Sequence, residues 1–250
     1  MKIQLIRNAT LWLEYGGLNI LVDPMLMDAE VMPAFPNTPN ELRNPRVGLP
    51  ELETDYLNPD LLIVTHTHVD HWDEAAAKQL GKDIPLICQP GDENVFLGVG
   101  FTNVTVVDKK HEHHSVRFAR TSGHHGTGEI GERMGKVSGF VLEADGEPVT
   151  YIAGDTIWCE EPAEAIRQYT PEVIVVNAGG ARFVEGDPIT MDGPDVVAVK
   201  LHAPSAHVIA VHMDAINHCV MSRTDLATYL ASEQMDGQVL IPRDGESFEF

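Results

Sequence analysis

Three histidines and an aspartate lie within six residues, in the sequence His66-Thr-His-Val-Asp-His71. They follow four apolar residues, Leu61 to Val64, which predict a short buried strand. Because residues i and i+2 of an extended backbone share a face, His66 and His68 are expected to point the same way. Imidazole and carboxylate groups are transition-metal ligands, so we predict a metal site where this strand ends. The alternative, a polar loop with surface histidines, does not explain this spacing directly after an apolar strand.

Three later positions offer further ligands, each at the end of an expected strand. Gly123-His-His-Gly126 follows a strand that begins near Val116, and its glycines permit a sharp turn and close backbone approach. Either of its two histidines is a candidate ligand. Asp155 ends a second strand, where a buried carboxylate requires a partner such as a metal ion; its alternative role is to cap a helix. His212 ends a third strand, Val208 to Val211.

Composition sets limits on the class of protein. The chain has 250 residues, of which 43% are hydrophobic, enough for a sizeable core. Its apolar runs are too short to span a membrane, and Met1 to Ile6 reads as a strand rather than a signal peptide. The three cysteines are too few and too widely spaced for a disulfide framework, which predicts a cytoplasmic protein. A formal net charge of −21 disfavours nucleic-acid partners, whereas a homo-oligomer is left open.

The elements that must position the candidate ligands occur twice in the sequence. Residues 11–23 read as a strand, a glycine turn, a second strand and a closing aspartate, and residues 139–155 repeat this plan. Each aspartate is followed by another apolar strand, in residues 59–66 of the first copy and 171–178 of the second. Two copies of one sheet-forming unit predict two mixed β-sheets.

We therefore expect the α/β (α+β) class, as a four-layer αββα sandwich with helices on the outer faces of the sheets. No linker interrupts the sequence, so a single domain over residues 1–250 is predicted, with halves of about 1–120 and 121–250. The metal ligands would gather where the two sheets meet. Helices are expected at residues 73–80, 161–169, 192–201 and 223–233, and additional strands at 84–88, 104–107 and 206–211.

The first copy contains a long proline-rich insertion, Met25 to Leu57. Long irregular segments are often lids or binding loops, so we expect this one to border the metal site; its alternative role is to cover a sheet edge. It carries Arg43 and Arg46, and Arg182 lies in the equivalent place of the second copy. Guanidinium groups bind carboxylate or phosphate, so the three are candidate substrate contacts, unless they pair with surface carboxylates. Residues 109–114, although rich in histidine, are expected to form a solvated hairpin tip.

The spacing His-x-His-x-Asp-His over residues 66–71 resembles the signature of the metallo-β-lactamase superfamily. His125, Asp155 and His212 are similar to further motifs of that superfamily, so the resemblance extends over nearly the whole chain. It is closest to the branch that contains ascorbate-6-phosphate lactonase and N-acyl phosphatidylethanolamine phospholipase D. The resemblance implies the same αββα fold.

The resemblance also implies two divalent metal ions. Metal one would be bound by His66, His68, His125 and Asp155, and metal two by Asp70, His71, His212 and Asp155. Asp23 would support the site by accepting hydrogen bonds from ligand imidazoles. His125 is favoured over His124 because His125-Gly126 resembles the family's His-Gly form; His124 would then lie beside the ligands or touch the substrate. Cys159 and Cys219 match no family ligand position, so we expect buried thiols there.

The function implied is a metal-dependent hydrolase, in which a hydroxide shared by the two ions cleaves a lactone, other ester or phosphodiester of a small anionic substrate. Asp70 would carry a proton to the leaving group, and His218 is a candidate for holding the substrate oxyanion. Zinc is the default ion for nitrogen-rich ligation, although manganese and iron also suit these ligands. The alternatives are a non-enzymatic metal or ligand sensor on the same fold and a nuclease-type phosphodiesterase. A secreted β-lactamase and a flavo-diiron oxidoreductase fit less well, since a signal peptide and a flavodoxin domain are lacking.

Overall fold

The computed structural model describes residues 1–250, whose strands form two sheets of seven strands each. The first has the order β14-β1-β2-β3-β4-β5-β6, with β1 Lys2–Arg7, β2 Thr10–Tyr15, β3 Leu18–Val22, β4 Leu61–Val64, β5 Leu86–Cys88, β6 Val104–Val106 and β14 Ser247–Glu249. The second has the order β13-β12-β11-β10-β9-β8-β7, with β7 Lys110–His113, β8 Val116–Ser122, β9 Ser138–Glu143, β10 Thr150–Ile152, β11 Val173–Asn177, β12 His207–Val211 and β13 Val239–Leu240.

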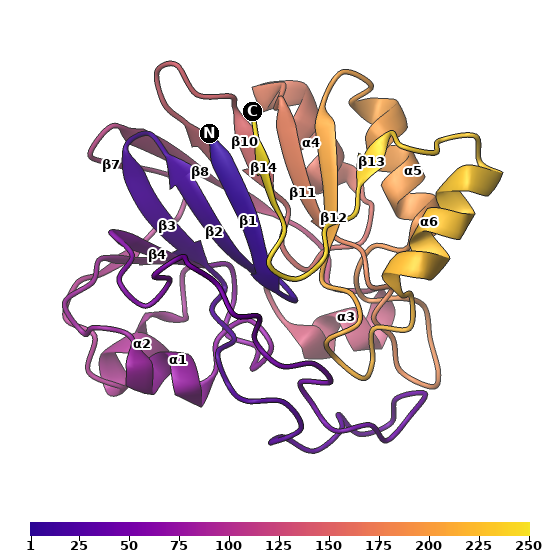
Figure 1. Cartoon of the computed structure of the whole chain (residues 1–250), viewed down its shortest axis with the longest axis horizontal. Coiled ribbons are helices and arrows are strands. Elements are labelled where there is room, and N and C mark those ends of the chain that lie inside the picture. The colour runs from indigo at the N-terminus through magenta and orange to yellow at the C-terminus, as the bar shows by residue number, and fades with distance from the viewer.

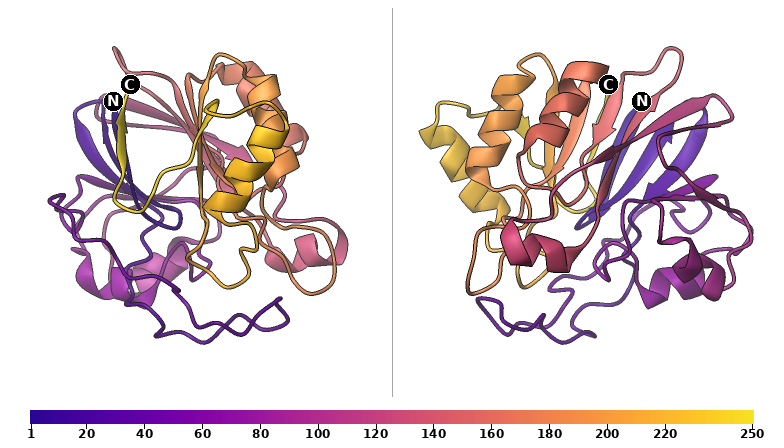
Figure 2. Two further views of the ribbon diagram at one scale, coloured as in Figure 1. Left: turned by 45° about the vertical axis from the view of Figure 1, so that its right-hand side comes forward. Right: turned by 180° about the vertical axis from the view of Figure 1, so that it is seen from behind.

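Six helices accompany the sheets (Figure 1). They are α1 Glu74–Gln79, α2 Glu93–Gly98, α3 Gly128–Met134, α4 Glu160–Tyr169, α5 Gly193–His202 and α6 Arg223–Ser232. Helices α4, α5 and α6 run along the outer face of the second sheet, and α1 and α2 lie beside the first (Figure 2). No helix is long and apolar enough to cross a membrane.

Three apolar cores hold these layers together. Successive residues of a strand point to opposite faces, so Ile63 of β4 packs between the sheets whereas its neighbour Leu62 packs towards α1 and α2. In the second sheet, Val175 of β11 packs between the sheets and Ile174 packs towards α4, α5 and α6. Strands buried on both faces need continuous apolar sequence, as the structure shows for β4 and β11. The predicted αββα sandwich is confirmed.

The repeat seen in the sequence is also a repeat of topology. β2 pairs antiparallel with β3, which pairs parallel with β4, and β9, β10 and β11 are joined in the same way. From β14 to β6, neighbouring strands of the first sheet form three antiparallel and then three parallel pairs, and the second sheet has the same order of pairs from β7 to β13. The chain passes from one sheet to the other between β6 and β7, earlier than the residue 120 expected, and β14 returns to the first sheet.

Residues 109–114 differ from the sequence prediction. Most of them form the edge strand β7, which pairs with β8, and only the turn after His113 is a hairpin tip. Helices α2 and α3 and strands β13 and β14 were not predicted from the sequence, because each spans seven residues or fewer and has no strong hydrophobic period.

The buried side chain of Arg7 anchors the long loop between β3 and β4. The guanidinium of Arg7, at the end of β1, donates hydrogen bonds to the carbonyl oxygens of Met25, Met27 and Val47 at 2.8 to 3.0 Å. Because these acceptors come from both ends of the loop, Arg7 holds its base against the sheet. The tip of the loop is left to reach over the ends of the strands (Figure 1).

Candidate metal centre

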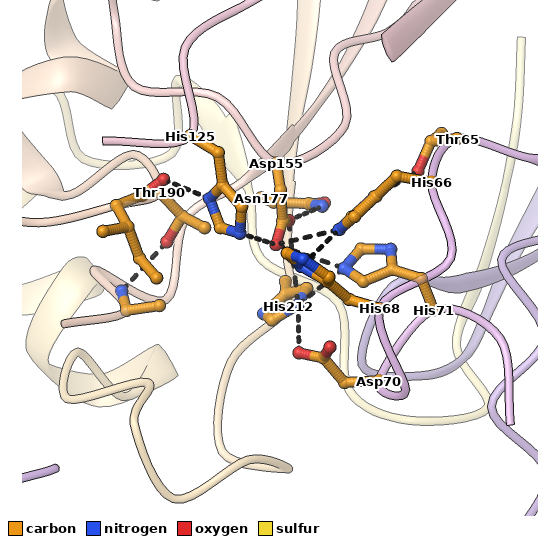
Figure 3. Close-up of polar contacts among 12 residues, drawn as sticks. Thr65, His66, His68, Asp70, His71, His125, Asp155, Asn177, Thr190 and His212 are labelled. Atoms are coloured by element: carbon orange, nitrogen blue, oxygen red, sulfur yellow. Dashed lines mark hydrogen bonds and ion pairs between the residues drawn. The ribbon is translucent and has the colours of Figure 1, made fainter. Parts of the chain in front are cut away.

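All seven predicted ligands converge at the carboxyl-terminal ends of strands from both sheets (Figure 3). Four follow β4, and the others follow β8, β10 and β12: His66, His68, Asp70 and His71, then His125, Asp155 and His212. The backbone is specialised at two of these ends. Gly154, before Asp155, has φ +71°, and a Cβ there would lie 2.4 Å from the carbonyl oxygen of Ser138. His212 adopts φ +64°, in the left-handed region that non-glycine residues seldom enter.

The side chains fall into two groups around one carboxylate. His66, His68 and His125 form one group, and Asp70, His71, Asp155 and His212 form the other. Oδ2 of Asp155 lies 3.5 Å from Nε2 of His125 and 3.3 Å from Nε2 of His71, one residue from each group. His212 Nε2 lies 3.4 Å from Oδ2 of Asp70. Asp155 therefore occupies the place between the two groups.

These separations suit metal coordination. Ligand atoms at 2.0–2.1 Å from a tetrahedral ion lie roughly 3.3 Å from one another. The nitrogen–nitrogen distances of 3.1 Å between His66 and His68 and between His71 and His212 are close to this value. A donor set of imidazole nitrogens and carboxylate oxygens fits zinc, manganese or iron.

The outward-facing ring nitrogens of His125 and His71 support the same interpretation. His125 Nδ1 donates to the carbonyl oxygen of Ile189 at 2.7 Å, which leaves Nε2 unprotonated and facing Asp155. His71 Nδ1 lies 2.8 Å from Oδ2 of Asp23, which also accepts hydrogen bonds from Thr65. Outward hydrogen bonds of this kind fix the tautomer and ring orientation of metal-binding histidines.

Buried charge gives an electrostatic argument for a cation. Although burial would raise it, the pKa of the Asp155 carboxyl is held well below its usual range by His71 and His212. Burial lowers the pKa of His71, yet the carboxylates of Asp155 and Asp23 raise it to about 10. The buried carboxylates thus stabilise a positive charge in this site. A divalent cation supplies that charge in place of protons.

A cavity of about 290 Å³ opens beside the clusters. Its polar wall is formed by His68, Asp70, His125 and His218. Its apolar wall comes from the long loop, the turn after β4, helix α3 and the segment before α5: Phe35, Pro36, Val69, Met134, Phe183 and Ile189. No lysine or arginine lines it.

The long loop borders this cavity, as the sequence predicted, and it is fixed there by one buried amide. Asn217 Oδ1 accepts from the backbone N–H of Phe35 at 3.0 Å, and its Nδ2 donates to Thr38 Oγ1 at 2.6 Å. Asn44, also in the loop, donates to the same Oδ1 at 2.8 Å. Asn217 precedes His218, so one turn after β12 supplies both the loop anchor and a cavity residue.

The three arginines do not reach the cavity. Arg43 donates to the carbonyl oxygens of Glu30 and Val31 within its own loop, at 2.6 and 2.9 Å. Arg182 donates to the carbonyl oxygen of Gly186, and Arg46 is exposed to solvent. The positive charge of an arginine does not by itself predict that its side chain faces the substrate, because carbonyl oxygens of the loop also accept hydrogen bonds from a guanidinium.

His124 is also placed differently from the sequence prediction. It is 57% exposed, and its Nε2 lies 3.0 Å from Oε1 of Glu161, outside the two clusters. Consecutive residues of an extended segment point to opposite sides, so a ring next to His125 is directed away from the centre. Of the two thiols expected to be buried, Cys219 is buried against His212 Nδ1 at 3.2 Å, whereas Cys159 is only half-buried.

Sequence reasoning missed two asparagines that bond to the aspartates of the site. Asn177 Nδ2 donates to Oδ1 of Asp155 at 2.6 Å, and Asn8 Nδ2 donates to the carbonyl oxygen of Asp70 at 3.0 Å. The repeat contained a signal for the first: Asn177 ends β11 as Thr65 follows β4, and Thr65 binds the other aspartate, Asp23. Asn8 had no such signal.

With the geometry in hand, the comparisons with known proteins define the class. Residues 2–212 match the family model of the beta-lactamase superfamily domain. The chain therefore belongs to the metallo-β-lactamase superfamily. Several relatives carry the name UPF0173 metal-dependent hydrolase. The chain is a metal-dependent hydrolase of this superfamily.

Individual relatives are more informative. UPF0173 protein YddR of Bacillus subtilis is 37% identical over the full length of both chains. The crystal structure of isothiocyanate hydrolase from Delia radicum gut bacteria superposes with a TM-score of 0.95 at 36% identity, covering 100% of this chain and 99% of that one. The N-acyl-phosphatidylethanolamine-hydrolyzing phospholipase D of Saccharomyces cerevisiae is 28% identical over 57% of this chain and 31% of its own, in line with the predicted branch.

Proposed function

We propose that the chain hydrolyses a small, uncharged electrophile that carries an apolar substituent, with isothiocyanates as the leading class. The observation that carries the proposal is the cavity beside the clusters, which has an apolar wall and no cationic side chain. Away from the metal-binding side chains, an anionic group would find no cationic side chain on the apolar wall and would lose hydration there. We therefore place a neutral substrate ahead of the anionic one expected from the sequence.

Two divalent ions fit the two side-chain groups, one at His66, His68 and His125 and one at Asp70, His71 and His212, with Asp155 between them. Zinc is our first choice, with manganese or iron as alternatives. When bound, such ions lower the pKa of water and polarise the atom that is attacked.

The residues at the cavity divide the remaining tasks. Asp70 lies on the polar wall, and its carboxylate is in position to pass a proton to the leaving nitrogen or oxygen. His218 is buried, and burial lowers its pKa to about 4, so its ring is neutral at pH 7. Its ring lines the cavity, where it could meet a polar atom of the substrate; its Nδ1 is buried and has no hydrogen-bond partner within the protein. The ring of Phe35 meets that of His218 edge-on at 5.0 Å between centroids, which holds it in place.

The similar solved structure named an isothiocyanate hydrolase supports the choice of substrate class. Addition of water to R–N=C=S forms a C–O bond at the central carbon and places a proton on nitrogen. Cleavage of the C–N bond then gives R–NH2 and carbonyl sulfide, so the reaction consumes one water. An apolar R group would lie against Phe35, Phe183 and Ile189.

A substrate panel tests the proposal. Metal-loaded protein is given phenethyl isothiocyanate, a neutral lactone, a neutral p-nitrophenyl ester and bis-p-nitrophenyl phosphate, and kcat/KM is measured for each. We expect the isothiocyanate to be preferred and the anionic diester to be the poorest substrate. Phe35→Ala should raise KM for the isothiocyanate roughly tenfold, since it removes an aromatic contact worth on the order of 1–2 kcal/mol. Preference for the diester would overturn the proposed substrate class.

A further inference from the structure

A second group of potential ligands lies outside the candidate metal centre. It consists of His124, Cys159 and Glu161, whose ligand atoms all lie within 4.8 Å of one another. His124 belongs to the turn after β8, whereas Cys159 caps the N-terminus of α4 and Glu161 lies in its first turn. The three are therefore brought together by the fold and not by sequence.

The donor set is that of a soft or borderline divalent cation. Thiolate, imidazole and carboxylate bind zinc at about 2.3, 2.0–2.1 and 2.0–2.2 Å, which places neighbouring ligand atoms roughly 3.3–3.5 Å apart. His124 Nε2 and Glu161 Oε1, at 3.0 Å, are already close to this distance. Cys159 Sγ lies within 4.8 Å of both atoms, and the exposed His124 ring leaves a side open for water.

We propose that His124, Cys159 and Glu161 form an accessory binding site for a thiophilic divalent cation such as Zn²⁺. The site is separate from the metal centre, because none of its three side chains belongs to either cluster there. It gives roles to a histidine and a cysteine that the hydrolytic reaction does not use.

The accessory site is coupled to the metal centre through the backbone. The N–H of His124 donates to Oγ1 of Thr156 at 3.0 Å, and the N–H of Ile157 donates to the carbonyl oxygen of His124 at 2.9 Å. These bonds join the segment of His125 to the segment of Asp155. A cation bound to His124 and Cys159 would fasten the same two segments, so it should stabilise the fold without contacting the substrate.

Cobalt substitution tests the proposal, because the seven ligands of the metal centre are all nitrogen or oxygen donors. Purified full-length protein is titrated with Co²⁺, and the near-ultraviolet sulfur-to-cobalt charge-transfer band is recorded. We expect the band in the wild type and in Cys88→Ser, whose thiol is buried in the first sheet's outer core. Cys159→Ser should abolish it. Absence of the band from the wild type, or its persistence in Cys159→Ser, would overturn the proposal.

Zinc stoichiometry provides the second measurement. After equilibration with Zn²⁺ and gel filtration, His124→Ala and Glu161→Gln should each hold about one equivalent less than the wild type. Both residues lie at the surface, so neither change should prevent folding. Equal zinc content in all three proteins would contradict an accessory site, whatever the activity on any substrate, and the result is therefore independent of the proposed function.

Discussion

The two halves of the molecule share a topology but use its aspartates differently. Asp23 follows β3, and Asp155 follows β10, the equivalent strand of the second sheet. Asp23 is turned into the protein, where it binds Thr65 and the outer nitrogen of His71. Asp155 faces the inner nitrogens of histidines from both side-chain groups. One copy supports the site and the other forms its centre.

The difference arises because the second copy has two more residues than the first between the end of the strand and the aspartate. Val22 of β3 pairs with Ile63, and Ile152 of β10 pairs with Val175, so these are equivalent positions. Asp23 comes one residue after Val22, whereas Asp155 comes three residues after Ile152. The added Ala153 and Gly154 carry the carboxylate beyond the sheet, with glycine passing the Ser138 carbonyl. An internal repeat thus supplies equivalent positions, and small length differences assign their roles.

The largest effect is expected at the residue that links the two aspartates. His71 lies between Asp23, at 2.8 Å, and Asp155, at 3.3 Å. His71→Ala should lower kcat/KM by at least about a thousandfold, because it removes a ligand and disorients the shared carboxylate. It also leaves buried charge unpaired, which should destabilise the protein by about 3–5 kcal/mol in urea unfolding. His111→Ala, on the edge strand β7, is the control. Activity of His71→Ala within tenfold of wild type would contradict the claim that His71 connects the roles of Asp23 and Asp155.

Asp23 should show the intermediate effect of a supporting residue. Asp23→Asn keeps the shape but weakens the hydrogen bond that orients His71, so metal affinity should fall about 10- to 100-fold. Competition with a chelator measures it, and Asp145→Asn at the exposed turn of the second hairpin is the matched control. An unchanged affinity would mean that Asp23 serves only the fold.

Asn177 is the counterpart of Thr65 in the second half, and its loss should have a smaller effect. Asn177→Ala removes the donor to Asp155 Oδ1, a hydrogen bond to a charged group worth about 1.5–3 kcal/mol. Much of that should be recovered when the carboxylate binds metal, so we expect about a tenfold loss in kcat/KM with metal content retained. Loss of all metal from Asn177→Ala would instead place this residue on a level with the ligands.

The smallest effect is expected in the insertion that only the first half carries. Arg43 bonds to its own loop, at the surface, so Arg43→Ala should change unfolding free energy by no more than about 0.5 kcal/mol. KM for neutral and for anionic substrates should stay within about twofold of wild type. A selective rise of KM for an anionic substrate would return this arginine to substrate binding.

The sequence was sufficient for the architecture and for the convergence of seven side chains, because both rest on strong local patterns. Apolar strands such as β4 and β11 are recognisable by run length, and the candidate ligands follow the ends of β4, β8, β10 and β12. The repeat made the two-sheet arrangement predictable without the resemblance. Side-chain direction was harder to predict. His124 and His125 are adjacent in the sequence between two glycines, and only the folded structure shows which ring faces the metal centre.

What the sequence could not supply was the partner of each polar side chain across long separations. Asn217 bonds to Phe35 and Asn44, more than 170 residues away, and neither position has a local signal. The positions of the arginines were equally inaccessible, since Arg43 and Arg182 donate to loop carbonyl oxygens and do not line the cavity. The apolar wall of the cavity exists only after segments far apart in the sequence, from Phe35 to Ile189, have met.

Metal stoichiometry in matched aspartate variants tests the central claim most directly. The measurement uses a Cys159→Ser background, so that the accessory site does not contribute, and determines bound metal by elemental analysis after equilibration with excess Zn²⁺. We expect about two equivalents in this background and in Asp23→Asn, and fewer than one in Asp155→Asn, with all three proteins folded by circular dichroism. Full metal content in Asp155→Asn, or equal losses from both variants, would contradict the assignment of the two aspartates to different roles.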